Sequence, residues 1–118
     1  MDRIVRHLRA EATIAPAVTG VLIVSDDPLL SLDLEMALTG QGLTTRTIGF
    51  SAAATTALPP HMAVILDIEK PAEVTACLLN WLARALAPVM VVSSFEPEAV
   101  TGLPPGTVWY AKPLRVDD

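Results

Sequence analysis

The sequence predicts an α/β fold in which one parallel sheet is covered by helices on both faces. Two observations lead to this prediction. Short apolar, β-branched segments of the kind that lie buried in parallel sheets occur at residues 21–24, 62–66 and 89–92. Segments with helical periodicity separate them, and two further strand-like segments complete a doubly wound sheet of five strands.

The first strand leads directly into a long helix. Residues 21–24 end at Ser25-Asp26-Asp27-Pro28, and Asp or Ser followed by Pro at the first helical position is a helix start. We expect Gly42 to stop the helix after about Gln41. The predicted core stripe of this helix consists of Leu30, Leu34, Ala37 and Leu38.

An exposed strand and a small helix are expected next. Residues 44–48 are rich in threonine, which is typical of an edge strand. Ser51 is expected to cap a helix over residues 52–58, which Pro59 and Pro60 end.

The second half of the chain alternates strands and helices in the same way. Strands are expected at residues 62–66, 89–92 and 107–111. A helix is expected over residues 72–86, and one or two helical turns over residues 96–101. A polar residue follows each of these strands: Asp67, Ser93 and Lys112.

Composition limits the classes of protein to which the chain can belong. Its 118 residues, 52% of them hydrophobic, suit one domain with its own core. The longest apolar run, residues 85–92, contains Pro88 and is far shorter than the roughly 18 residues needed to cross a bilayer. The net charge of −5 gives no reason to expect nucleic-acid binding, and the single cysteine, Cys77, excludes an internal disulfide. We therefore expect a cytoplasmic domain that binds neither nucleic acid nor membrane.

The polar residues at the strand ends predict a site. In an open α/β sheet, ligands bind beyond the carboxyl ends of the strands, so these side chains are expected to converge. The carboxylates of Asp26 and Asp67 suit a hard divalent cation such as Mg²⁺. The Ser93 hydroxyl and the Lys112 ammonium suit the oxygens of a phosphoryl group. Asp67, on the central strand, is the natural nucleophile for forming an aspartyl phosphate.

Four segments follow one another along the chain, each at a strand end: Val21-Leu22-Ile23-Val24-Ser25-Asp26-Asp27-Pro28, Val64-Ile65-Leu66-Asp67-Ile68-Glu69-Lys70-Pro71, Pro88-Val89-Met90-Val91-Val92-Ser93-Ser94 and Tyr110-Ala111-Lys112-Pro113-Leu114. With these segments in this order, the chain resembles, over about residues 20–115, the receiver domain of two-component response regulators. The resemblance implies a flavodoxin-like sheet with the strand order 2-1-3-4-5.

The resemblance also implies a mechanism. Asp67 would accept a phosphoryl group from a phosphohistidine on a histidine kinase or a histidine phosphotransfer protein. Asp26 and Asp67 would ligate Mg²⁺ directly, with the backbone carbonyl of Glu69 as a third ligand. Ser93 would hydrogen-bond the phosphoryl group and Lys112 would form an ion pair with it. Such a domain is not an enzyme in the usual sense, since it catalyses only its own phosphorylation and dephosphorylation and signals by changed protein–protein contacts.

Further roles follow from the same resemblance. Trp109 would be a rotamer-switching aromatic, and the peptide bond between Lys112 and Pro113 would be cis. Leu29 and Leu32 lie off the predicted core stripe of the first long helix, and the resemblance implies that they dock the histidine-bearing partner.

Two features depart from the family pattern near the first strand. Ser25 stands where the first of two adjacent acidic residues is usual, and we interpret it as a spacer. Asp27 begins the helix and is expected to cap it rather than to serve the metal. The connections on either side of Ser93 are also short, so the fourth helix is expected to be a single turn or absent.

The two ends of the chain are linked by one hypothesis. The family's fifth helix would begin near Asp118, where this sequence ends. Residues 1–19 are expected to form a helix and linker ahead of a receiver domain at residues 20–118. A helix there could replace the fifth helix on the sheet, and a homodimer is the competing way to cover that face. The apolar stripe of this helix consists of Ile4, Val5, Leu8 and Ala12.

Two other functions compete with a phosphorylated receiver. A degenerate receiver would act as a scaffold without phosphate, and Ser25 and the short loops favour it. A phosphatase resembling the haloacid dehalogenases would also place a nucleophilic Asp after an apolar strand. That family requires a second Asp at the position where this chain has Glu69, and Asp26 would lack a role in such a phosphatase.

Overall fold

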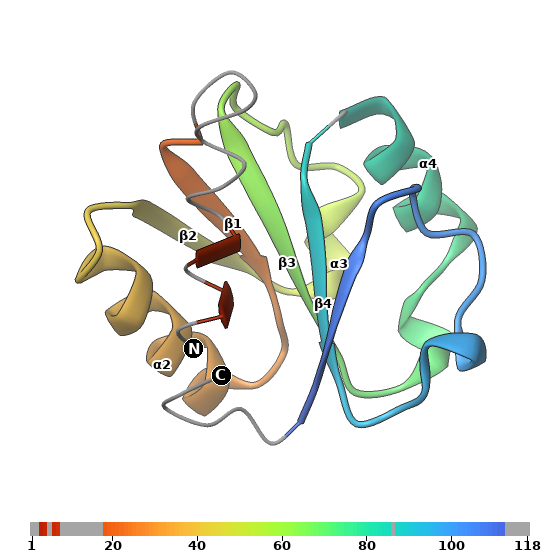
Figure 1. Ribbon diagram of the computed structural model, residues 1–118. Helices are drawn as coiled ribbons and strands as arrows, with labels where there is room; N and C mark the ends of the chain where they lie inside the picture. Colours follow the sequence, from red (N-terminus) through yellow and green to blue (C-terminus); the bar gives the residue numbers. More distant parts are fainter. Residues whose placement is uncertain (1–2, 5, 8–17, 86, 113–118) are drawn as a thin grey trace.

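The computed structural model describes residues 3–4, 6–7, 18–85 and 87–112. Its sheet has five parallel strands in the order β2-β1-β3-β4-β5, which confirms the predicted fold (Figure 1). The strands are β1 (Gly20–Val24), β2 (Thr44–Ile48), β3 (Met62–Ile68), β4 (Val89–Ser93) and β5 (Val108–Ala111). The helices are α2 (Pro28–Thr39), α3 (Phe50–Ala53) and α4 (Ala76–Ala85), with 3₁₀ turns η1 (Pro71–Glu73) and η2 (Pro97–Ala99).

Helices lie on both faces of the sheet, which we name the α2 face and the α4 face (Figure 1). An apolar cluster lies between each face and its helices. Successive side chains of a strand point to opposite faces, so the continuous apolar strands supply both clusters. Under α2 lie Val21, Ile23, Ala63, Ile65, Met90 and Val92, with Leu34 and Leu38 of the helix. Under α3 and α4 lie Leu22, Val24, Val64, Leu66, Ile68, Val89 and Val91, with Ala53, Leu78, Trp81 and Leu82. Each fully buried aliphatic side chain contributes about 1.5–3 kcal/mol, so β1, β3 and β4 dominate the stability of the fold.

Helix α2 begins as predicted and ends slightly earlier. Asp27 caps it, since its Oδ1 accepts the N–H groups of Leu29 (3.0 Å) and Leu30 (3.3 Å). The helix ends at Thr39 rather than Gln41. Gly42, at φ +86°, has the left-handed backbone that favours glycine and turns the chain towards β2.

The predicted helix over residues 52–58 is wrong in its bounds. Helix α3 covers only Phe50–Ala53, and Gly49 rather than Ser51 is its N-cap. The hydroxyl groups of Thr55 and Thr56 donate to the carbonyl of Ala52 at 3.1 and 2.8 Å. These side-chain bonds compete with helical backbone bonds, so the helix does not continue.

The predicted helix over residues 72–86 also begins later than expected. The Glu73 carboxylate accepts the N–H groups of Glu69 (2.7 Å) and Lys70 (2.8 Å), which closes the turn after β3. The chain then makes the 3₁₀ turn η1, and α4 starts only at Ala76. The Thr75 hydroxyl caps α4 by accepting the N–H of Leu78 (3.1 Å).

The N-terminal residues that the structure describes pack on the α2 face. Residues 3–4 and 6–7 are helical, and Ile4 is fully buried in the α2-face cluster. The Tyr110 hydroxyl donates to the carbonyl of Arg3 (3.3 Å), and the Arg3 guanidinium lies 5.4 Å from the centre of the Tyr110 ring. Burial raises the pKa of Tyr110, and the charge of Arg3 opposes this as the smaller effect.

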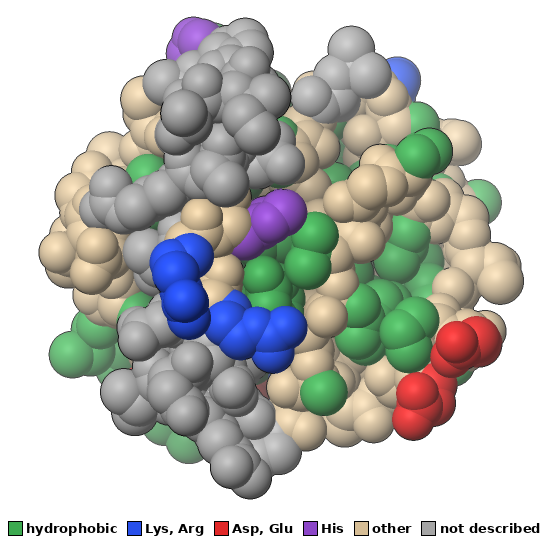
Figure 2. Space-filling view, in the orientation of Figure 1, with side chains coloured by type: hydrophobic (Ala, Val, Ile, Leu, Met, Phe, Trp, Pro, Cys, Tyr) green, Lys and Arg blue, Asp and Glu red, His purple; other side chains and the backbone are tan. Residues whose placement is uncertain are grey.

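These contacts agree with the hypothesis that an N-terminal helix covers this face. Figure 2 shows Lys and Arg side chains on this side of the molecule, with hydrophobic side chains beside them. The other members of the predicted stripe, Val5, Leu8 and Ala12, lie outside the described residues.

We expect Ile4→Ala to lower the free energy of unfolding by about 2–4 kcal/mol, because it opens a cavity in the α2-face cluster. Urea denaturation measures this change. Leu29→Ala is the matched control, since Leu29 is 76% exposed and its truncation should cost less than about 0.5 kcal/mol. Equal effects of the two substitutions would show that the N-terminal segment does not hold the sheet face.

Candidate functional site

Asp67 is a buried carboxylate near the carboxyl end of the central strand β3. Its exposed fraction is zero. Its Oδ2 accepts a hydrogen bond from the Ser25 hydroxyl at 2.7 Å, and its Oδ1 forms an ion pair with the Lys112 ammonium. A buried charge is stable only when it is paired and hydrogen-bonded, and these two partners supply both.

The alternation of strand side chains explains why these residues meet. Ser25, Asp67 and Lys112 each lie two residues beyond a side chain that is buried on the α2 face, namely Ile23, Ile65 and Tyr110. Residues two apart on a strand share a face, and all three positions are at the carboxyl edge of the sheet. The backbone hydrogen bonds of the sheet continue past the strand ends. The Ser25 N–H donates to the Ile48 carbonyl and the Lys112 N–H donates to the Ser93 carbonyl, both at 2.9 Å.

Asp26 lies on the α4 face of the sheet, opposite to the face of Ser25. It follows Leu22 and Val24 in the alternation, so it faces α3, where its Oδ1 accepts the N–H of Phe50 at 3.3 Å. Gly49 permits this approach, because a Cβ there would lie 2.7 Å from the Asp26 oxygen. The contact that the structure gives Asp26 is therefore with α3, and its role as a metal ligand beside Asp67 stays a prediction.

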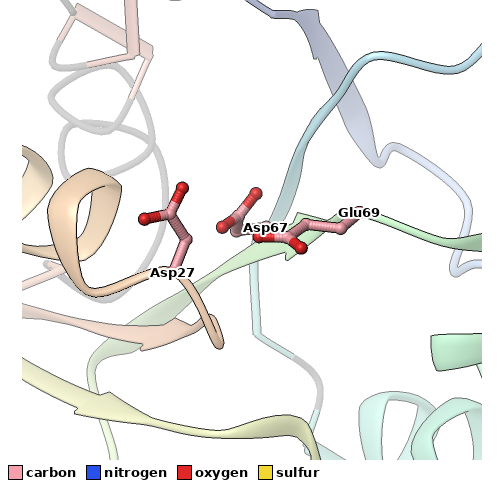
Figure 3. Close-up of side chains that lie close together, drawn as sticks. All are labelled: Asp27, Asp67 and Glu69. Atoms are coloured by element: carbon pink, nitrogen blue, oxygen red, sulfur yellow. The ribbon is translucent and has the colours of Figure 1, made fainter.

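The carboxylates of Asp27 and Glu69 lie close to that of Asp67. Asp27, Asp67 and Glu69 each place one carboxylate oxygen within 4.8 Å of the others, and this cluster can hold a metal ion (Figure 3). Asp27 caps α2 through Oδ1, so it has a second oxygen to offer. For Glu69 the cluster includes the side chain, whereas the sequence-based prediction used its backbone carbonyl.

The donor set fits a hard cation. Three carboxylates, from the cap of α2, the end of β3 and the residue that follows β3, provide the oxygen ligands that Mg²⁺ and Ca²⁺ require.

Ser93 and Trp109 are joined through Phe95. Ser93 is fully buried at the end of β4, and its Oγ accepts the Phe95 N–H at 3.0 Å. The half-buried Trp109 donates its indole N–H to the Phe95 carbonyl at 3.2 Å. The predicted switch residue is thus connected to the loop that carries Ser93, and its switching role stays a prediction. Pro113, the predicted cis-proline, lies outside the described residues.

Leu29 and Leu32 are exposed, as their position off the core stripe predicts. Together with Met36 they form an apolar stripe on α2, with exposed fractions of 76%, 51% and 65% respectively. Their spacing of i, i+3, i+7 places them on one side of the helix, next to its Asp27 cap. The docking role itself stays a prediction.

Ser25 is the site residue that the sequence analysis missed. It was interpreted as a spacer, yet it is 6% exposed and contacts Asp67 directly. The period-two alternation from Val21 and Ile23 could have identified it, because the same count places Asp26 on the opposite face.

Comparison with known proteins adds no relative. No family model and no curated protein matches the chain. Of the helices in the described part of the chain, none has the length and apolar character needed to cross a membrane. The geometry around Asp67 is therefore the basis for a function.

Proposed function

We propose that the protein is a cytoplasmic receiver domain that accepts a phosphoryl group on Asp67 from a phosphohistidine partner. The observation that supports this most is the environment of Asp67. It is a fully buried carboxylate at the carboxyl edge of a 2-1-3-4-5 sheet, ion-paired with Lys112 and grouped with the carboxylates of Asp27 and Glu69. A buried nucleophile, a neighbouring ammonium and a cation site are the groups that phosphoryl transfer to a carboxylate requires.

The residues of the chain have separate tasks in this reaction. An Asp67 oxygen attacks the phosphorus, the P–N bond of the phosphohistidine breaks, and the imidazole leaves with a proton from solvent. Lys112, whose ammonium lies on Asp67, can follow the negative charge onto the phosphoryl oxygens. A Mg²⁺ ion held by Asp27, Asp67 and Glu69 would offset the charge of the phosphoryl oxygens. The altered surface then signals through protein contacts.

The two neighbouring aspartates provide a matched test of the cation site. We expect Asp27→Asn to weaken Mg²⁺ binding by about tenfold or more, since even indirect partners of a metal are worth that much. Asparagine is as good an N-cap as aspartate, so α2 should be retained. Asp26→Asn should leave the affinity nearly unchanged, because its carboxylate faces Phe50. Titration of the protein with Mg²⁺ alone, followed by tryptophan fluorescence, measures both affinities. A larger loss of affinity in Asp26→Asn than in Asp27→Asn would instead support the ligand set that the family resemblance implies.

The apolar stripe of α2 is the proposed docking surface for the histidine-bearing partner. We expect the double substitution Leu29→Ser and Leu32→Ser to slow transfer from a phosphorylated histidine phosphotransfer protein by about tenfold, as the loss of central interface side chains does. Phosphorylation by acetyl phosphate should be unaffected, because a small donor needs no docking surface. Equal slowing with both donors would contradict the docking role.

A receiver that works as a scaffold without phosphate is the second candidate. The observations that favour it are Ser25 in place of an acidic residue and the turn of Asp26 towards α3. Incubation with acetyl phosphate and Mg²⁺ separates the two functions. A receiver gains the mass of one phosphoryl group, located on Asp67 by peptide mapping, whereas a scaffold gains none.

A further inference from the structure

We infer that Ser25 is a positioning residue that orients Asp67 for phosphoryl transfer and selects Oδ1 as the attacking atom. This inference rests on the proposed function. Receiver domains usually have an acidic residue at the position of Ser25, and a hydroxyl there has a different task, since it donates a hydrogen bond to Asp67.

The hydrogen bonds of Ser25 form a short relay from α2 to Asp67. The N–H of Asp27, the cap residue of α2, donates to Ser25 Oγ at 3.0 Å. The Ser25 hydroxyl has one proton and two acceptors within reach, Asp67 Oδ2 at 2.7 Å and the Asp27 carbonyl at 3.3 Å. The carboxylate is nearer and charged, so it takes the proton, and the incoming N–H polarises the hydroxyl further.

Burial strengthens the effect of this hydrogen bond on the orientation of the Asp67 carboxylate. Ser25 is 6% exposed and Asp67 is not exposed, so water does not compete readily for Oδ2. The final torsion of an aspartate side chain is broad, and a fixed donor on one oxygen is what sets the carboxylate plane. The other oxygen, Oδ1, accepts no hydrogen bond from the described residues and faces the Lys112 ammonium.

The two oxygens therefore have different fates in the reaction with acetyl phosphate. Asp67 Oδ1 forms the new bond to phosphorus, the P–O bond to the acetyl group breaks, and acetate leaves with the electron pair. Oδ2 becomes the carbonyl oxygen of the aspartyl phosphate and still accepts the Ser25 hydroxyl. Lys112, adjacent to Oδ1, is already beside the incoming phosphoryl group.

The test compares Ser25→Ala with Ser31→Ala. Ser31 is also a buried serine, 7% exposed, but its hydroxyl donates to the Pro28 carbonyl (3.2 Å) within α2 and not to Asp67. With acetyl phosphate and Mg²⁺, we expect Ser25→Ala to lower the phosphorylation rate at saturating donor by about tenfold, since misoriented reacting groups cost up to about 10²-fold. The half-saturating donor concentration should be unchanged, because Ser25 contacts Asp67 and not the donor. Ser31→Ala should match the wild-type protein in both quantities.

Ser25→Thr separates the hydroxyl from the shape of the side chain. It keeps the donor, and we expect a rate within about threefold of wild type for the folded variant. A Ser25→Ala protein as fast as wild type, or a folded Ser25→Thr protein as slow as Ser25→Ala, would overturn the inference while phosphorylation of the wild type still supports the proposed function. A wild-type protein that gains no phosphoryl group on Asp67 would overturn both.

Discussion

Asp67→Asn is expected to abolish phosphorylation by acetyl phosphate and by a phosphohistidine partner. An amide oxygen is too weak a nucleophile to replace the carboxylate, so no adduct should form at any donor concentration. The fold should persist, because asparagine has nearly the same shape and its oxygen can still accept the Ser25 hydroxyl. Intact-protein mass spectrometry after incubation with donor and Mg²⁺ measures the loss.

Asp33→Asn is the matched control for this prediction. Asp33 is an exposed carboxylate on α2, so its neutralisation changes the net charge equally without touching the site. It should leave the extent of phosphorylation unchanged. An Asp67→Asn protein that still gains the phosphoryl group would place the acceptor elsewhere and contradict the proposed function.

Lys112→Met is expected to lower the free energy of unfolding substantially. It leaves Asp67 as a buried, unpaired carboxylate, since the Asp67 side chain is not exposed at all. Breaking a buried ion pair in this way costs about 3–5 kcal/mol, and the 21% exposure of the Lys112 side chain reduces the expected loss to about 2–3 kcal/mol. The free energy of unfolding from urea denaturation measures it.

Two further variants test the cause. Lys70→Met removes the charge of an exposed lysine and should cost less than about 0.5 kcal/mol. Combining Lys112→Met with Asp67→Asn removes both charges, so the double variant should be more stable than Lys112→Met alone. If the double variant loses as much as the sum of the single ones, the two groups are not coupled and the ion pair is not what stabilises the site.

Much of the fold could be predicted from local sequence signals. The apolar segments of β1, β3 and β4 are long enough and β-branched enough to define buried strands by themselves. Asp27-Pro28 defined the start of α2 for the same local reason, because a cap and its helix are neighbours in the chain. Helix bounds were less predictable where side chains compete with the backbone, as Thr55, Thr56 and Glu73 do.

The site was only partly predictable. Asp67 and Lys112 were expected at one edge of the sheet, and the ion pair between them agrees with that expectation. The contacts of Ser25, Asp26 and Asp27 could not be predicted, because three adjacent polar residues differ only in the direction of their side chains. That direction depends on how far the β1 ladder continues, and it continues through Ser25.

The sequence by itself determined the strands, the class of fold and the residues that follow each strand, since these depend on composition and local spacing. The tertiary structure alone decided which of those residues meet. It placed the Ser25 hydroxyl, rather than the Asp26 carboxylate, on Asp67, and it packed Ile4 against the α2 face. The physical reason is that contacts between residues distant in sequence depend on register and on which face of the sheet each side chain occupies. A shift of one residue along a strand moves a side chain to the opposite face of the sheet.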